Sequence, residues 1–191
     1  MGYGALLVVA TAFGLVGCGS SSSAAEEQPK PVSSASFASQ RYGYTLTLPS
    51  GWRREPTPGT WNGALYPGEP GVDTFVDSSA TRRVFVAARR VRGAVTGPKW
   101  AAEIAAGVPP VCSRSDRTAV TVAASPAQIA VYECSDGYVA INATFLRAGR
   151  GFAIGWVSPS EPAGAVARGR QQFDAVLGSF AFANSNNKGG S

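Results

Sequence analysis

Residues able to carry chemistry are few, because the chain contains no histidine. Histidine is the commonest general base and a usual zinc ligand, so its absence also excludes a Ser-His-Asp arrangement. Neither the Gly-x-Ser-x-Gly motif of hydrolases nor the Gly-x-x-x-x-Gly-Lys motif that cradles phosphates occurs. Lys99 is the only lysine between Phe37 and Ala183. We therefore expect a non-enzymatic protein that carries no metal and no cofactor.

Two carboxylates offer the remaining route to catalysis. Glu133 and Asp136 flank a predicted tight turn, and a glycosidase needs two facing carboxyl groups about 5–10 Å apart. An exposed turn that happens to carry two acids needs no such chemistry, and we favour that interpretation. A hydrolase that uses this pair is kept as an alternative. Asp73 and Asp77 lack the spacing of a calcium loop.

Aromatic side chains give a softer signal, which points to binding. Trp52, Trp100 and Trp156 each adjoin a segment of apolar periodicity, so we expect them in the core. Trp61 and Tyr66 differ, since they fall in or beside a Pro- and Gly-rich stretch predicted as a surface loop. We predict that Trp61 and Tyr66 mark a binding surface for a lipid, a wall component or a protein.

Basic residues exceed acidic ones by 17 to 12, which gives a net charge of +5. Most of the excess lies in one segment, whose arginines we predict to be the second part of that surface: Arg82, Arg83, Arg89, Arg90 and Arg92. They would attract an anionic phospholipid, a wall polymer or an acidic partner. A solvated strand edge protected by charge explains them without a function, and we favour that interpretation over binding. No aromatic-basic RNA motif or Cys/His finger is present, so nucleic acid is not an expected partner.

The first 17 residues have the character of a secretory signal. Residues 2–17 are apolar and end in Leu15-Val16-Gly17 before Cys18. They are fewer than the about 20 apolar residues of a spanning helix, and they lack the positive charge that usually opens a signal. The run Leu-Val-Gly-Cys resembles the lipobox of bacterial lipoproteins. This resemblance implies cleavage of residues 1–17, a lipid on Cys18 and an extracytoplasmic protein attached to the membrane. The alternative is an ordinary apolar segment with an incidental cysteine.

Composition divides the rest of the chain. Residues 18–36 are rich in Ser, Ala and Pro, which is typical of a flexible tether, and residues 184–191 have the character of a disordered tail. Residues 37–183 have the size of one domain. Cys112 and Cys134 are an even pair in an oxidising compartment, so we expect a disulfide between them. Two free thiols or an intermolecular bond are the alternatives.

Strands are predicted from period-2 alternation and from β-branched or aromatic runs. The main segments are 42–48, 72–77, 84–91, 118–122, 127–134, 138–146 and 152–157. Shorter extended pieces are expected after Trp52 and at 180–182. Asp136-Gly137 is a strong hairpin signal, and Ser125-Pro126 is predicted as another turn.

Two helices are predicted. An Ala-rich helix over 99–106 has Pro98 in its first turn and Gly107 as its stop. A second helix is expected to be capped by Ser160, to be opened by Pro162 and to carry apolar residues at helical spacing. It should cover the strand face that bears Val139, Ile141, Ala143 and Phe145. The predicted fold is α+β, an antiparallel sheet of about six strands flanked by helices.

Two segments carry a resemblance to a known fold. Residues 41–52 read Arg-Tyr-Gly-Tyr-Thr-Leu-Thr-Leu-Pro-Ser-Gly-Trp, and residues 172–180 read Gln-Phe-Asp-Ala-Val-Leu-Gly-Ser-Phe. In this order they resemble the Mog/PsbP-like fold, and the likeness extends to the LpqN-type lipoproteins of actinobacteria. The resemblance implies an αβα sandwich with a binding or assembly role and brings no catalytic residue. A sensor-like ligand-binding domain, similar to the extracytoplasmic domains of actinobacterial kinases, is the alternative.

Overall fold

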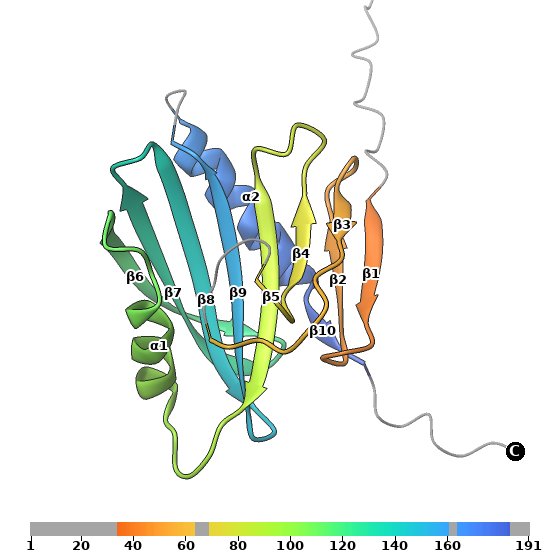
Figure 1. Cartoon of the computed structure of the whole chain (residues 1–191), viewed down its shortest axis with the longest axis vertical. Helices are drawn as coiled ribbons and strands as arrows, with labels where there is room; N and C mark the ends of the chain where they lie inside the picture. Colours follow the sequence, from red (N-terminus) through yellow and green to blue (C-terminus); the bar gives the residue numbers. More distant parts are fainter. Residues whose placement is uncertain (1–33, 64–68, 161–163, 184–191) are drawn as a thin grey trace, which may run out of the picture. The chain divides into compact units, whose positions relative to one another are not determined.

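Two antiparallel sheets make up the framework of the domain (Figure 1). The computed structural model describes residues 34–63, 69–160 and 164–183. The smaller sheet has the order β1-β2-β10 and the larger one the order β3-β4-β5-β9-β8-β7-β6. The strands are β1 (Ala35–Ser39), β2 (Tyr44–Leu48), β3 (Arg53–Glu55), β4 (Asp73–Val76), β5 (Arg83–Arg90), β6 (Cys112–Val122), β7 (Ser125–Cys134), β8 (Tyr138–Arg147), β9 (Arg150–Pro159) and β10 (Ala181–Phe182). The helices are α1 (Gly97–Ala106) and α2 (Ala165–Ser179).

The two helices lie on opposite faces of the larger sheet, with α1 in front and α2 behind in Figure 1. Successive side chains of β5 point to opposite faces of the sheet, so each face can pack against a different helix. Val84 and Val86 belong to the cluster that contains α2, whereas Phe85 and Ala87 belong to the cluster that contains α1. The predicted α+β fold, an αβα sandwich, is therefore confirmed, although the larger sheet has more strands than the six predicted and a second sheet is added.

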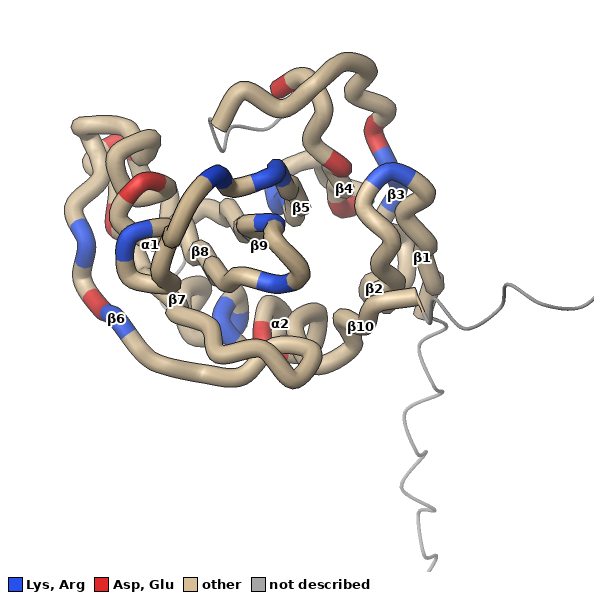
Figure 2. Tube along the Cα trace, turned by 90° about the horizontal axis from the view of Figure 1, so that it is seen from below, with Lys and Arg blue, Asp and Glu red and all other residues tan. Residues whose placement is uncertain are grey.

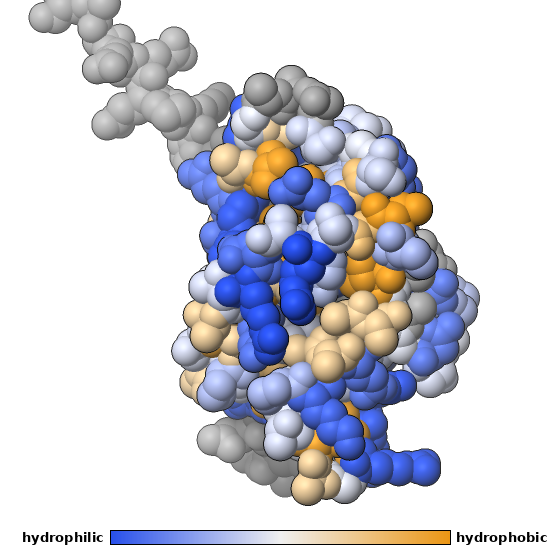
Figure 3. All heavy atoms as spheres, turned by 90° about the vertical axis from the view of Figure 1, so that its left-hand side faces the viewer, coloured by the Kyte–Doolittle hydropathy of each residue, from blue (hydrophilic) through white to orange (hydrophobic). Residues whose placement is uncertain are grey.

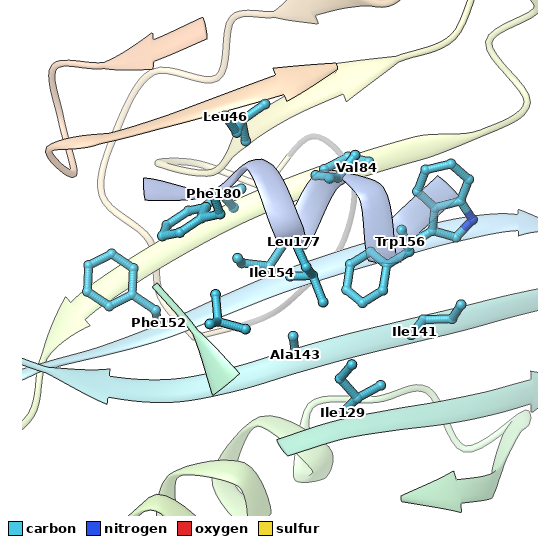
Figure 4. Packing of buried hydrophobic residues seen from close by; sticks show 14 of the residues in the cluster. Leu46, Val84, Ile129, Ile141, Ala143, Phe152, Ile154, Trp156, Leu177 and Phe180 are labelled. Carbon is cyan, nitrogen blue, oxygen red and sulfur yellow. The ribbon is translucent and has the colours of Figure 1, made fainter. Parts of the chain in front are cut away.

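The main core lies between the larger sheet and α2 (Figure 4). The predicted face of β8 is confirmed, because Val139, Ile141, Ala143 and Phe145 are all buried there. Phe173, Val176 and Leu177 cover this core from α2. Burial of this kind stabilises by about 1.5–3 kcal/mol for each large apolar side chain.

A smaller core lies under α1. Trp100 and Ile104 are the buried residues of the helix, and the Trp100 indole N–H donates to the Phe152 carbonyl at 2.8 Å. Gly151 makes room for the ring, since a Cβ there would lie 2.5 Å from Trp100 Cε2. The helix begins at Gly97, two residues before the predicted start, and it has Pro98 in its first turn and ends before Gly107 as predicted.

A buried carboxylate joins the two sheets. Asp73 of β4 accepts hydrogen bonds from Ser39 Oγ at 2.6 Å and from the Tyr44 hydroxyl at 2.9 Å, and it pairs with Arg54 at 3.1 Å. Burial, together with the Asp73 charge, raises the pKa of Tyr44 well above its ordinary value, so the hydroxyl stays protonated and donates. We assign this group a structural role.

Local predictions differ from the structure at two connections. The turn between β6 and β7 is formed by Ala123 and Ala124, both with positive φ, and not by Ser125-Pro126. The second helix begins at Ala165 after Gly164, which provides no side-chain cap. The predicted cap, Ser160, instead donates its hydroxyl to the Gly137 carbonyl at 3.0 Å. The Asp136-Gly137 turn between β7 and β8 is confirmed.

Several predictions concern residues outside the described ranges. These are the signal peptide at 1–17, the lipid on Cys18, most of the tether at 18–36 and the tail at 184–191. The end of the predicted tether belongs to the fold, because β1 starts at Ala35. In the described part of the chain, none of the helices is both long enough and apolar enough to cross a bilayer.

Candidate binding pocket

A pocket of about 370 Å³ opens on the α1 side of the larger sheet, beyond the C-terminal end of that helix. Strands β5, β9 and β8 supply its floor, and the segment Gly107–Pro109 and the Cys112–Cys134 pair line its side. A volume of this order is typical of sites for small ligands. Figure 3, which faces α1 and β6, shows hydrophobic residues in separate groups among hydrophilic ones.

The pairing of the strands explains why the floor is hollow. Arg83, Val157 and Ala140 are paired across β5, β9 and β8, and Phe85, Gly155 and Asn142 form the next row on the same face. Gly155 has no side chain, and the Phe85 ring lies over it, because a Cβ at Gly155 would overlap the ring edge. Ala140 is also small. The two rows leave space between Arg83 at one side and Asn142 at the other.

Two buried polar atoms lie at this floor without a partner. Arg83 Nε and Asn142 Oδ1 are both inaccessible, and neither has a hydrogen-bond partner among the described residues. The Asn142 side chain is 4% exposed and also borders a narrower hollow beneath α1. A buried polar group left unpaired costs about 1–3 kcal/mol, and more when charged. Both side chains line the same pocket, although these two atoms are themselves inaccessible to solvent.

The predicted disulfide is present and forms part of the pocket wall. Cys112 and Cys134 are directly paired residues of β6 and β7 and are bonded to each other. β6 is the last strand of the sheet, and its residues from Ser113 to Ala119 are exposed. The bond therefore holds an edge strand that has little burial of its own. For a separation of 22 residues, loop-entropy estimates give about 3 kcal/mol.

The prediction that Trp61 is an exposed binding residue is wrong. Trp61 is 4% exposed and packs edge-on against Trp100, with ring centroids 6.0 Å apart. The loop turns tightly at Gly71, whose φ is +75° and whose place beside the Trp61 backbone leaves no room for a Cβ. The loop is thus anchored to the core under α1. Tyr66 lies outside the described residues. Trp100 and Trp156 are buried as predicted, and Trp52 packs against the main core.

The five predicted arginines do not form one surface. Arg82 and Arg83 lie at the start of β5, whereas Arg89, Arg90 and Arg92 lie at or beyond its end. In Figure 2 several basic residues gather at that far end, where Arg90, Arg92 and Arg150 border the same open hollow. Five residues of β5, from Val84 to Ala88, separate the two groups. Of the five, only Arg83 lines the pocket.

Two of these arginines are already paired. Arg82 Nε donates to Asp77 Oδ2 at 2.9 Å and Nη1 donates to Gln172 Oε1 at 3.1 Å. Arg89 forms an ion pair with Glu103 and lies over the Trp100 ring, 5.3 Å from its centroid. Desolvation acts to raise the pKa of Asp77, but hydrogen bonds from Ser79 and Arg82, with the Arg82 charge, together lower it below its ordinary value. Arg82 and Arg89 therefore stabilise the fold. Nothing in the sequence distinguishes these paired arginines from Arg83, which lines the pocket.

The two carboxylates of the alternative hydrolase are not brought together. Asp136 lines the pocket at its rim. Glu133 is paired directly with Val139, whose side chain faces the α2 core, so Glu133 points to that same face, whereas the pocket that Asp136 lines opens on the α1 side. Both side chains are exposed. Within the described ranges, no three His, Cys, Asp or Glu side chains are grouped to hold a metal ion.

Comparisons with known proteins define the fold. No protein-family model matches the sequence, and no curated protein matches it. The solution structure of cyanobacterial PsbP (CyanoP) from Synechocystis sp. PCC 6803 is similar, with a TM-score of 0.55, 15% identity and coverage of 88% of this chain and 98% of that chain. LpqN of Mycobacterium tuberculosis, described as involved in cell envelope biogenesis, gives a TM-score of 0.48, 13% identity and coverage of 80% and 91%. The fold is PsbP-like, which confirms the resemblance seen in the sequence.

Proposed function

We propose that this chain is an extracytoplasmic, non-enzymatic binding module of the cell envelope, anchored to the membrane by lipid on Cys18. The pocket beside the Cys112–Cys134 bond is its binding site. Support for the compartment comes from the lipobox-like run before Cys18 and from the disulfide, since such bonds persist in oxidising environments. The PsbP-like fold is compatible with this role, although fold alone does not define function.

The observation that carries the proposal is a largely apolar pocket that two polar side chains line. Arg83 and Asn142 border it, and each has one buried polar atom without a partner among the described residues. A few polar groups in an apolar cavity are what fixes the orientation of a small ligand. Among the described residues, Asp136 is the only carboxylate that lines the pocket, and a single carboxylate at the rim lacks the partner that hydrolysis of a glycoside needs. We therefore assign binding and not turnover.

The test fills the pocket with a large side chain and compares the small molecules that remain bound to each protein. The full lipidated protein is purified in mild detergent and examined by native mass spectrometry beside Ala140→Trp, which places a large ring on the pocket floor. Ala119→Trp is the matched control, because Ala119 is an exposed residue of β6 outside the pocket. We expect a bound small molecule in the wild type and in Ala119→Trp that is lost in Ala140→Trp. The same bound molecules in all three proteins would refute the pocket as the site.

The anchor is tested separately. Membrane fractionation of Cys18→Ala should move the protein from the membrane fraction to the medium or the extracytoplasmic extract. Intact mass of the wild type should begin at Cys18 and include the added acyl chains. Retention of Cys18→Ala in the membrane fraction would contradict lipid anchoring at this residue. It would not bear on the proposal that the pocket is the binding site.

A further inference from the structure

We infer that the ligand of this pocket is a small organic anion, an apolar chain or ring that carries a carboxylate, and that Arg83 binds its charge. The inference rests on the proposed binding role and names the chemistry of the ligand. It depends on which charges in the pocket are already neutralised.

Arg83 is the arginine without a counter-charge at this end of β5. Its neighbour Arg82 is paired with Asp77, and Arg89 is paired with Glu103. Among the residues that the structure describes, none forms an ion pair with Arg83. A guanidinium keeps its charge in proteins, and Arg83 is half-buried in the pocket lining. The other charged residue that lines the pocket, Asp136, is exposed at the rim and is not paired with Arg83. An anion in the pocket would supply the counter-charge that Arg83 lacks.

The donor chemistry of the guanidinium narrows the ligand further. Arg83 Nε is itself inaccessible to solvent, so the ligand would bind the remaining N–H donors of the group, which require an acceptor oxygen. A carboxylate accepts two parallel hydrogen bonds from the fork of a guanidinium, which is the strongest arrangement for this pair. Asn142, across the row of Gly155, presents an amide that can satisfy a second polar group of the ligand.

The rest of the lining requires an apolar body. Phe85, Val157 and Ala140 lie on the floor, and Val108 and Pro109 lie on the wall. Water bound there would leave this apolar surface wet, whereas an apolar group gains about 25 cal/mol for each Å² removed from water. A small inorganic anion would reach Arg83 but leave the cavity of about 370 Å³ largely unfilled. The combination fits an amphipathic carboxylate.

Isothermal titration calorimetry of the whole protein tests the inference with matched probes. Octanoate and phenylacetate are compared with octanamide and phenylacetamide, which have nearly the same shape without the charge. Each is titrated into the wild type, Arg83→Gln and Arg90→Gln. The last is the control, because it removes the same charge from an exposed residue at the other end of β5. Circular dichroism of each variant confirms the fold.

We expect at least one carboxylate to bind the wild type and Arg90→Gln at least about tenfold more tightly than its amide, as a charged hydrogen bond implies. Arg83→Gln should remove that preference. Equal affinity of the carboxylate and its amide, or binding of neither carboxylate, overturns the inference. If Ala140→Trp still displaces a molecule retained by the wild type, the proposed function survives this failure. If it does not, both fail.

Discussion

Gly155→Ala tests the packing that creates the pocket. An added Cβ would lie 2.8 Å from Phe85 Cδ2 and closer still to two other ring atoms, and real Cβ atoms essentially never approach within 3.0 Å. Phe85 is 1% exposed, so the ring has little room to move except toward the pocket. Overpacking of this kind costs about 1–3 kcal/mol. Replacing a strand glycine by alanine also stabilises the fold by about 0.5–1 kcal/mol, because the unfolded chain then loses less conformational entropy on folding.

Because the overlap is severe, we take the upper end of the overpacking cost and subtract the entropic gain. We therefore expect Gly155→Ala to lower the free energy of unfolding by about 2 kcal/mol. The melting temperature should fall by about 4–8 °C. Thermal and urea unfolding of the purified protein measure both. Gly178→Ala is the control, because Gly178 lies in α2 with no heavy atom within 4 Å of the added Cβ. It should be neutral or slightly stabilising.

A double-mutant cycle identifies the cause. If the Phe85 ring is the obstacle, Phe85→Leu should cost less in the Gly155→Ala background than in the wild type, with an interaction energy of about 1 kcal/mol or more. Unchanged stability of Gly155→Ala would refute the packing described here. Strict additivity of the two substitutions would refute Phe85 as its cause.

Three further changes probe other features. Ala124→Gly should raise the free energy of unfolding by about 1 kcal/mol, because Ala124 has a φ of 61° in the β6–β7 turn; an unchanged urea midpoint would contradict this. Replacing both Cys112 and Cys134 by alanine should lower it by about 3 kcal/mol, and a stability equal to the wild type would show that β6 needs no bond. Asp77→Asn should destabilise by about 1–3 kcal/mol at pH 7. Since folding lowers the pKa of Asp77, the advantage of the wild type should be complete above about pH 4 and shrink as the pH falls through the folded-state pKa; a difference independent of pH would contradict it.

The fold could be predicted where the pattern is local. The alternation of Val139, Ile141, Ala143 and Phe145 fixes one face of β8, and Asp136-Gly137 has the backbone freedom that its turn needs. The β6–β7 turn was not predictable in this way, because alanine is a poor residue for positive φ and tertiary pairing imposes the conformation. Gly164 precedes α2 without a capping side chain, so no cap signal marks the start.

The site was less accessible to sequence reasoning, since it depends on register across three strands. Arg83, Val157 and Ala140 are far apart in the chain, and only the pairing of β5 with β9 and of β9 with β8 sets them in one row. Five arginines in one segment suggested one surface, but a strand separates its ends. Trp61 lies in a loop, yet Gly71 and the contact with Trp100 bring it into the core. Gly155 inside β9 is the signal that the sequence interpretation did not use, since a glycine within a strand can mark a close approach.

The most direct test of the binding role is a crystal structure of the protein purified in lipidated form from its own membranes. We expect density for a small molecule in the pocket, with an oxygen within hydrogen-bond distance of the Arg83 guanidinium and an apolar part against Phe85 and Val157. A pocket that holds only water, or a molecule bound elsewhere with Arg83 paired to the protein itself, would contradict the central claim.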